Sequence, residues 1–185
     1  KLALDGNFGG ITVATLKEAE YFLDHGIGDI TYAVPIVPAK LDAVAALMER
    51  GADLKLITDN ADVARAIAED GRRFKIMVEI DCGDHRTGID PSGAGLIEIA
   101  SVLNDASGAE LMGVLTHAGQ SYACRSEEEM IAVAEDERAA VVRAAERIKA
   151  EGMPCPIVST GSTPCVMFAR DVTGVTEGRP GVYMF

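Results

Sequence analysis

The sequence contains no tryptophan, only 3 histidines and 4 cysteines, and no apolar run that approaches the ~20 residues needed to cross a bilayer. Its start also lacks the basic segment and apolar stretch of a secretory signal. The cysteines form no C-x-x-C pair, so we expect reduced thiols in a cytoplasmic protein rather than a disulfide framework. With so few histidines, a closed His/Cys metal cage is not expected within this chain.

Basic residues are scarce as well. The chain has 17 lysines and arginines against 29 acidic residues, which gives a net charge of -12. A surface of this sign repels a phosphate backbone, so we expect no nucleic-acid partner, and without an apolar span we expect no membrane partner. What is present is an ordinary globular composition, with 48% hydrophobic and 25% charged residues among 185. That is enough for one domain with a real core.

Short apolar runs alternate with longer amphipathic segments along the whole chain. The expected strands are residues 11–14, 30–34, 54–58, 75–80, 111–115, 156–159 and 174–177. The expected helices are residues 16–24, 38–50, 60–70, 93–104 and 127–150, with a short helical turn at 164–169. Strict alternation of strands and helices favours parallel strands joined by right-handed crossovers.

Two α/β architectures fit this pattern, a doubly wound open sheet and a closed (β/α)8 TIM-type barrel. Seven strands without a glycine fingerprint after the first favour a barrel that lacks its first strand. Residues 2–7 would then be the tail of the first helix. The chain starts at Lys1 without a methionine, and residues 183–185 are typical of the middle of a strand. We therefore expect one barrel domain over residues 1–185, incomplete at both ends.

In a parallel barrel the chemistry lies where strands end and the following loops begin. The polar loops at such positions cover residues 81–88, 116–122, 159–164 and 178–183. Residues 159–163 surround Gly161 with hydroxyl groups and open onto a helical turn, where backbone N–H groups can hold a phosphate. Gly181 and Val182 could offer two more N–H donors to the same anion. A plain turn with an N-cap is the alternative for so short a motif.

Single side chains in the other loops are further candidates. Arg86 lies in a glycine-bracketed loop at the carboxyl end of a strand, and His117 follows a strand directly. Tyr122 and Tyr183 have similar positions. Each has an ordinary alternative, a solvated arginine or a structural histidine or tyrosine, but a place at the mouth of a barrel favours function. The acidic neighbours that could orient Arg86 are Glu79, Asp81 and Asp84.

In this order the motifs resemble the fold-type III enzymes that use pyridoxal 5′-phosphate (PLP). Their catalytic barrel, the alanine racemase N-terminal-like domain, is shared by alanine racemases, D-threonine aldolases and D-serine dehydratases. The residues that carry the resemblance are 11–20, 78–81 with Gly83 and 86–88, 116–122, 159–163 and 179–183. The first of these segments is similar to the second-strand signature of the D-threonine aldolase and D-serine dehydratase branch.

The resemblance implies a role for most of the candidate residues. Arg86 would bond the phenolic oxygen of PLP, and His117 would pack against its pyridine ring. Arg179 would face the ring nitrogen, and Tyr122 would line the substrate side. Arg86, His117 and Tyr122 are thus the implied catalytic residues. The other implied cofactor-binding residues are Ser159, Gly161, Ser162, Thr163, Gly181, Val182 and Tyr183.

The sequence departs from the family in two ways. The family carries its Schiff-base lysine on the first strand, upstream of the position of Thr12, and no lysine of this chain stands in that context. The lysines present are Lys1, Lys17, Lys40, Lys55, Lys75 and Lys149. The C-terminal β-domain, which in this branch supplies the ligands of a divalent metal (Zn or Mn), is also absent. We therefore expect a fragment that holds the phosphate end of PLP but is inactive alone.

The implied function of the complete protein is that of a PLP-dependent lyase acting on a β-hydroxy D-amino acid. Retro-aldol cleavage would give glycine and an aldehyde, whereas dehydration would give a keto acid and ammonia. Three alternatives stay open: an alanine or amino-acid racemase, a non-catalytic PLP-binding protein that handles cofactor supply, and a barrel without PLP. The full-length protein is expected to be a cytoplasmic homodimer.

Overall fold

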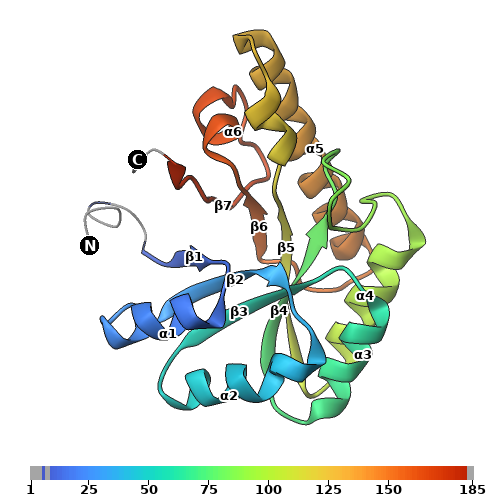
Figure 1. The fold of residues 1–185 in the computed structure, drawn as a ribbon. Coiled ribbons are helices and arrows are strands. Elements are labelled where there is room, and N and C mark those ends of the chain that lie inside the picture. Colours follow the sequence, from blue (N-terminus) through green and yellow to red (C-terminus); the bar gives the residue numbers. More distant parts are fainter. Residues whose placement is uncertain (1–5, 7–8, 183–185) are drawn as a thin grey trace.

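The structure is a computed structural model, which describes residue 6 and residues 9–182. Seven parallel strands form one sheet in the order β1-β2-β3-β4-β5-β6-β7. The sheet curls into part of a barrel, with β1 and β7 at its two edges (Figure 1). The strands are β1 (Ile11–Val13), β2 (Asp29–Pro35), β3 (Asp53–Thr58), β4 (Phe74–Ile80), β5 (Ala109–Thr116), β6 (Ile157–Thr160) and β7 (Glu177–Gly178).

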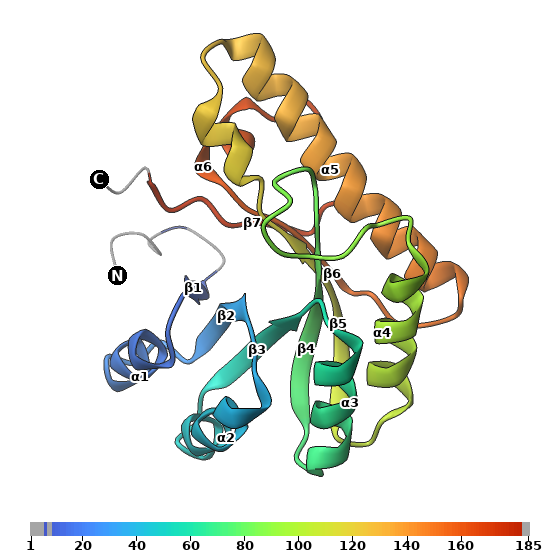
Figure 2. The same cartoon turned by 45° about the vertical axis from the view of Figure 1, so that its right-hand side comes forward.

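Helices follow the strands and lie outside the curled sheet (Figure 2). Two short 3₁₀ helices, η2 (Pro38–Lys40) and η3 (Gly119–Ala123), lie in the loops after β2 and β5. The α-helices are α1 (Leu16–Asp24), α2 (Leu41–Glu49), α3 (Ala61–Asp70), α4 (Ala94–Asp105), α5 (Glu127–Ala150) and α6 (Thr163–Phe168). No described helix is both long and apolar enough to cross a membrane.

Local capping determines where several helices begin. At α1, the Thr15 Oγ1 accepts a bond from the backbone N of Glu18 at 3.1 Å, and the Glu18 carboxylate accepts one from the Thr15 N at 2.9 Å. These two bonds form a capping box, which satisfies backbone donors that the first helical turn cannot pair internally. At the starts of α3 and α5, the side-chain oxygens of Asn60 and Ser126 accept bonds from backbone N–H groups of the first turn.

The main core lies between the outer face of the sheet and the helices. Because side chains alternate along a strand, β4 sends Ile76, Val78 and Ile80 to this outer core and Met77 to the inside of the curled sheet. Met77 packs there with Ile57 and Leu115 in a small second cluster. Glu79 is two residues beyond Met77, so it also faces inward.

The predicted α/β barrel fold is confirmed: the described residues form seven parallel strands of a partial barrel, and the predicted elements occur in the predicted order. The last strand differs most from the prediction. It was expected at residues 174–177, but Gly174 has φ +86° and the N–H of Val175 donates to the carbonyl of Val172. After this turn, Thr176 bonds Val158 of β6, and the paired strand register begins at Glu177. The expected helix tail at residues 2–7 lies, apart from residue 6, outside the described residues.

Candidate functional site

A cavity of about 400 Å³ opens at the carboxyl ends of the strands. Its lining residues are Thr12, Val13, Ala14, Ala33, Glu79, Arg86, Leu115, His117, Tyr122, Gly161, Ser162, Thr163, Arg179, Gly181 and Val182. The cavity therefore brings together nearly all the residues that the sequence singled out. The exceptions are Ser159, which is buried beside Arg179, and Tyr183, which lies outside the described residues.

The loop between β6 and α6 forms one end of the cavity. Ser162 caps α6, because its Oγ accepts a bond from the backbone N of Cys165 at 3.2 Å. The Ser121 hydroxyl of η3 lies 3.1 Å from the Ser162 Oγ. Ser162 and Thr163 are both buried. The hydroxyl groups that the sequence assigned to a phosphate are thus fixed by their neighbours rather than free on the surface.

The segment after β7 is attached to the same loop. The Thr163 Oγ1 accepts bonds from the backbone N of Gly181 at 3.0 Å and of Val182 at 2.9 Å. Two successive N–H groups that converge on one oxygen are the arrangement by which backbone binds anions. The two amides that the sequence offered to an anion thus converge as a pair, and in the structure their acceptor is the Thr163 hydroxyl.

Arg179 is held by the ends of two strands. Its Nη1 donates to the Ser159 Oγ at 3.0 Å and to the Thr160 carbonyl at 3.1 Å, and its Nη2 donates to the Thr116 carbonyl. Gly161 makes room for it, because a Cβ on Gly161 would lie 2.2 Å from the Arg179 Nη2. Such a forked set of donors fixes the guanidinium plane and keeps a positive charge at the cavity wall.

Arg86 has far fewer contacts. Its side chain is 62% exposed, and its carboxylate neighbour is Asp84 at 3.8 Å. The other two acidic residues that could orient it have different partners. Asp81 bonds the His85 ring at 2.6 Å, and Glu79 accepts a bond from the Thr87 hydroxyl at 2.8 Å. Arg86 is therefore a cation that can adjust to a ligand, in contrast to Arg179.

Glu79 lines the cavity, although the sequence indicated it only as a possible partner of Arg86. Its side chain is buried, and its Oε2 has no hydrogen-bond partner among the described residues. Burial raises the pKa of Glu79, while Arg86 and Arg179 oppose this shift. A single charged residue in the otherwise apolar second half of β4 was the signal in the sequence. An unpaired buried acceptor is costly, so this oxygen marks a place where a donor is expected to bind.

His117 stands at the centre of the lining, with its ring 6.3 Å from that of Tyr122 in a stacked arrangement. Tyr122 lies in η3, is 46% exposed and closes one side of the mouth. Burial lowers the pKa of His117, and the charges of Arg179 and Arg86 lower it further. The imidazole is therefore neutral at neutral pH, and a neutral imidazole can pack against an aromatic ring.

The depressed pKa of His117 gives a testable pH dependence. Below pH 6.5, the usual pKa of histidine, the unfolded chain binds a proton that the folded chain resists, so wild-type stability falls as the pH falls. His117→Gln removes this contribution. We expect the wild type to lose stability relative to the variant between about pH 7 and pH 5.5, and not between about pH 7 and pH 8. Urea unfolding at these pH values measures the difference, and parallel profiles for the two proteins would contradict the assignment.

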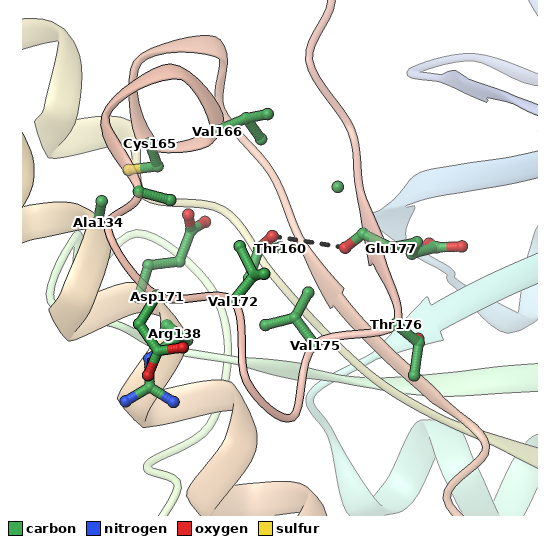
Figure 3. A pocket seen from close by; sticks show the side chains of 13 residues that line it. Ala134, Arg138, Thr160, Cys165, Val166, Asp171, Val172, Val175, Thr176 and Glu177 are labelled. Carbon is green, nitrogen blue, oxygen red and sulfur yellow. Dashed lines mark hydrogen bonds and ion pairs between the residues drawn. The ribbon is translucent and has the colours of Figure 1, made fainter. Parts of the chain in front are cut away.

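A second cavity of about 240 Å³ lies between α5, α6 and the segment that leads into β7 (Figure 3). Its wall is largely apolar, with Val166, Val172 and Val175 among its lining residues. Among its charged lining residues, Arg138 contacts Asp171 at 3.7 Å and also Glu135, outside the lining, at 2.5 Å. The other two, Glu137 and Glu177, accept bonds from backbone amides and from the Ser159 hydroxyl, respectively. This cavity lies outside the barrel, and we assign the chemistry to the cavity at the strand ends.

The cavity at the strand ends fits PLP. The apolar side chains of β1, β2 and β5 form one wall, which suits an aromatic ring. The polar part of the lining carries hydroxyl groups, paired amides and Arg179, which suit a phosphate and a polar ring edge. Glu79, whose Oε2 has no partner among the described residues, shares this lining with the two cations Arg86 and Arg179. None of the described lining residues is a lysine, and no described cluster of three His, Cys, Asp or Glu residues could hold a metal ion.

Comparison with known proteins agrees with this fit. Residues 1–185 match the family described as "Alanine racemase, N-terminal domain". The chain is 49% identical over 181 residues to D-threo-3-hydroxyaspartate dehydratase of Delftia sp. (strain HT23). This alignment covers 95% of this chain and 47% of that enzyme. It is 29% identical to D-serine dehydratase of Dictyostelium discoideum, over 95% of this chain and 48% of that enzyme.

Solved structures show the same relationship. The Delftia enzyme superposes with a TM-score of 0.92 and 48% identity, over 96% of this chain and 48% of that one. A mutant of a D-threo-3-hydroxyaspartate dehydratase, solved in a metal-free form, superposes with a TM-score of 0.92 and 48% identity, over 96% of this chain and 48% of that one. D-threonine aldolase of Filomicrobium marinum superposes with a TM-score of 0.88 and 25% identity, over 100% of this chain and 50% of that one. The chain spans about half the length of each of these enzymes.

Proposed function

The chain belongs to the alanine racemase N-terminal domain family, and on that basis we propose that it is the PLP-binding barrel of a lyase that acts on a β-hydroxy D-amino acid. The observation that carries the proposal is the cavity at the strand ends, where two cations, a neutral histidine and a hydroxyl-rich loop surround one space. The similarity to the Delftia dehydratase supports the substrate class.

In this proposal the phosphate of PLP binds the loop after β6. Ser162 and Thr163 offer hydroxyl groups there. The backbone amides of Gly181 and Val182 donate to the Thr163 hydroxyl, so they lie next to the same loop. This interaction would fix one end of the cofactor by several hydrogen bonds to a charged group, each worth about 1.5–3 kcal/mol. Tyr183, outside the described residues, and the buried Ser159 complete the set that we propose.

The rest of the cavity would orient the ring. Arg86 would turn inward to donate to the phenolic oxygen, since its present contacts are weak. Arg179 would present a fixed cation to the ring nitrogen, and His117 would pack on the ring face as a neutral imidazole. When bound, PLP supplies an electron sink that stabilises the negative charge developing on the amino acid as a bond at Cα or Cβ breaks. Tyr122, at the mouth, would border the substrate.

We assign two functional groups of the complete enzyme, the Schiff-base lysine and a divalent metal site, to segments that this chain does not span. The described lining offers no lysine, so we place the Schiff-base lysine on a strand that pairs with β1. A divalent metal that binds the substrate hydroxyl would be held by a C-terminal β-domain. The metal-free form of a D-threo-3-hydroxyaspartate dehydratase mutant is in line with a metal in the complete enzyme. The complete protein is proposed to be a cytoplasmic homodimer.

Product analysis of the full-length enzyme tests the proposed reaction. The enzyme is supplied with PLP and a divalent metal and incubated separately with D-threonine, D-serine and D-threo-3-hydroxyaspartate. We expect lyase products, a keto acid with ammonia from dehydration or glycine with an aldehyde from retro-aldol cleavage. Racemisation of alanine without either set of products, or no reaction with any of these amino acids, would refute the proposed function.

A further inference from the structure

An acidic residue interrupts the apolar face of α5. The buried residues of this helix are Ala134, Glu137, Ala140, Val141, Ala144, Ala145 and Ile148. Glu137 is the only charged member of this set, and it is only 1% exposed. A buried carboxylate costs several kcal/mol unless hydrogen bonds compensate its lost hydration, so its partners have to account for its presence.

The partners of Glu137 belong to the two loops that form the candidate site. The Glu137 Oε1 accepts a bond from the backbone N of Ala118 at 3.0 Å and from the backbone N of Gly161 at 3.1 Å. Ala118 directly follows His117, and Gly161 begins the loop that we assign to the phosphate. One carboxylate oxygen thus bridges the end of β5 and the end of β6, from outside the barrel.

These bonds do more than satisfy the carboxylate. Ala118 is fully buried, and both amides have Glu137 as their acceptor. Without it, two N–H groups in the interior would lose their partner, and each such loss costs about 1–3 kcal/mol. Two other contacts join these strand ends. The Ser121 and Ser162 hydroxyl groups bond each other further along both loops, and Arg179 bonds the carbonyls of Thr116 and Thr160, but neither contact provides an acceptor for the amides of Ala118 and Gly161.

We propose that Glu137 is a positioning residue that holds the His117 loop and the Gly161 loop in register, so that both contact the same ligand. The inference rests on the proposed function for the identity of that ligand. Glu137 does not line the cavity at the strand ends, so it acts through Ala118 and Gly161 and has no contact with the cofactor. Its position makes the geometry of the site depend on a residue of the outer helical layer.

Two substitutions at Glu137 separate positioning from charge. Glu137→Gln keeps an oxygen that can accept from both amides, whereas Glu137→Leu keeps the approximate size and removes the acceptor. The probe is pyridoxine 5′-phosphate, which has the ring and phosphate of PLP but no aldehyde, so it cannot react with surface lysines. Glu146→Leu is the matched control, because Glu146 is an exposed glutamate on the same helix.

Calorimetric titration of the chain measures the affinity for this probe. We expect Glu137→Leu to weaken binding at least about tenfold, and Glu137→Gln and Glu146→Leu to change it by less than about threefold. Rescue by glutamine is a result that a general loss of packing would not give. Equal affinity of the wild type and Glu137→Leu would overturn the positioning role. Failure of the wild type itself to bind the probe would instead refute the proposed function.

Amide NMR spectra provide a readout that requires neither ligand nor the leucine variant. An N–H that donates to a carboxylate resonates downfield, and this shift decreases when a neutral amide replaces the charged acceptor. In Glu137→Gln we therefore expect the amide protons of Ala118 and Gly161 to move upfield together. If Glu137→Leu does not fold, this measurement decides alone, and unchanged positions of both resonances would overturn the inference.

Discussion

Gly161→Ala is expected to weaken the binding of pyridoxine 5′-phosphate by at least about tenfold, equivalent to about 1.4 kcal/mol. The added Cβ would lie 2.2 Å from the Arg179 Nη2 and 2.6 Å from its Cζ. The guanidinium cannot simply move aside, because it is bonded to Thr116, Ser159 and Thr160. Either these bonds break or the loop shifts, and both changes disturb the phosphate end of the cavity. Titration calorimetry with the aldehyde-free probe measures the effect.

Gly28→Ala is the control for this variant. A Cβ at Gly28 meets only the Gly51 carbonyl, at an ordinary 3.4 Å, and Gly28 lies before β2, at the opposite end of the barrel from the cavity. This control is expected to bind the probe like the wild type. If Gly161→Ala also binds it with unchanged affinity while its fold is intact, Arg179 and the loop after β6 do not form the ligand site.

Gly113→Ala is expected to destabilise the chain by about 3 kcal/mol, the largest effect on stability that we predict. Gly113 lies in β5 with φ +139°, a conformation that is open to glycine but strained for other residues. A Cβ there would lie 1.9 Å from the Ile157 carbonyl of β6. Because this neighbour is backbone in a paired strand, relief requires that the two strands move apart. Urea unfolding followed by circular dichroism measures the loss.

Gly152→Ala is the control for Gly113→Ala, because it introduces the strain of a positive φ without a steric clash. Gly152 also has a positive φ, +78°, but a Cβ there has no other atom within 4 Å. Its substitution should therefore cost only the strain of a left-handed residue, about 1–2 kcal/mol. If Gly113→Ala is no more destabilising than this control, the close approach of β5 and β6 at Gly113 is not a feature of the folded chain.

Local patterns predicted the secondary structure well where the signal lies within the element itself. The helices α1 and α5 have the predicted bounds, because capping residues and apolar periodicity fix both ends. The last strand was misplaced, since pairing with β6 and the turn at Gly174 determine its start. The 3₁₀ helix η3 was not predicted, because its short sequence has no helical periodicity.

The site was predictable in composition but not in its internal contacts. The alternation of strands and helices placed Arg86, His117 and Arg179 at one end of the barrel, since parallel strands share a carboxyl edge. The sequence contained no sign that Arg179 bonds strand carbonyls. It named three acidic residues that could orient Arg86, and the structure pairs the arginine with one of them, Asp84. Glu137 was not among the candidates from the sequence, because its partners, the amides of Ala118 and Gly161, lie in two loops that only the fold brings together.

The central claim is that the cavity at the strand ends recognises the phosphate of a pyridoxal-type ligand, and one pair of titrations tests it. The chain is titrated with pyridoxine 5′-phosphate and, separately, with pyridoxine, which differs only in lacking the phosphate. Saturable binding of the phosphorylated compound is predicted, with at least about tenfold weaker binding of pyridoxine and displacement by PLP. Equal affinities for the two compounds, or no binding of either, would contradict the claim.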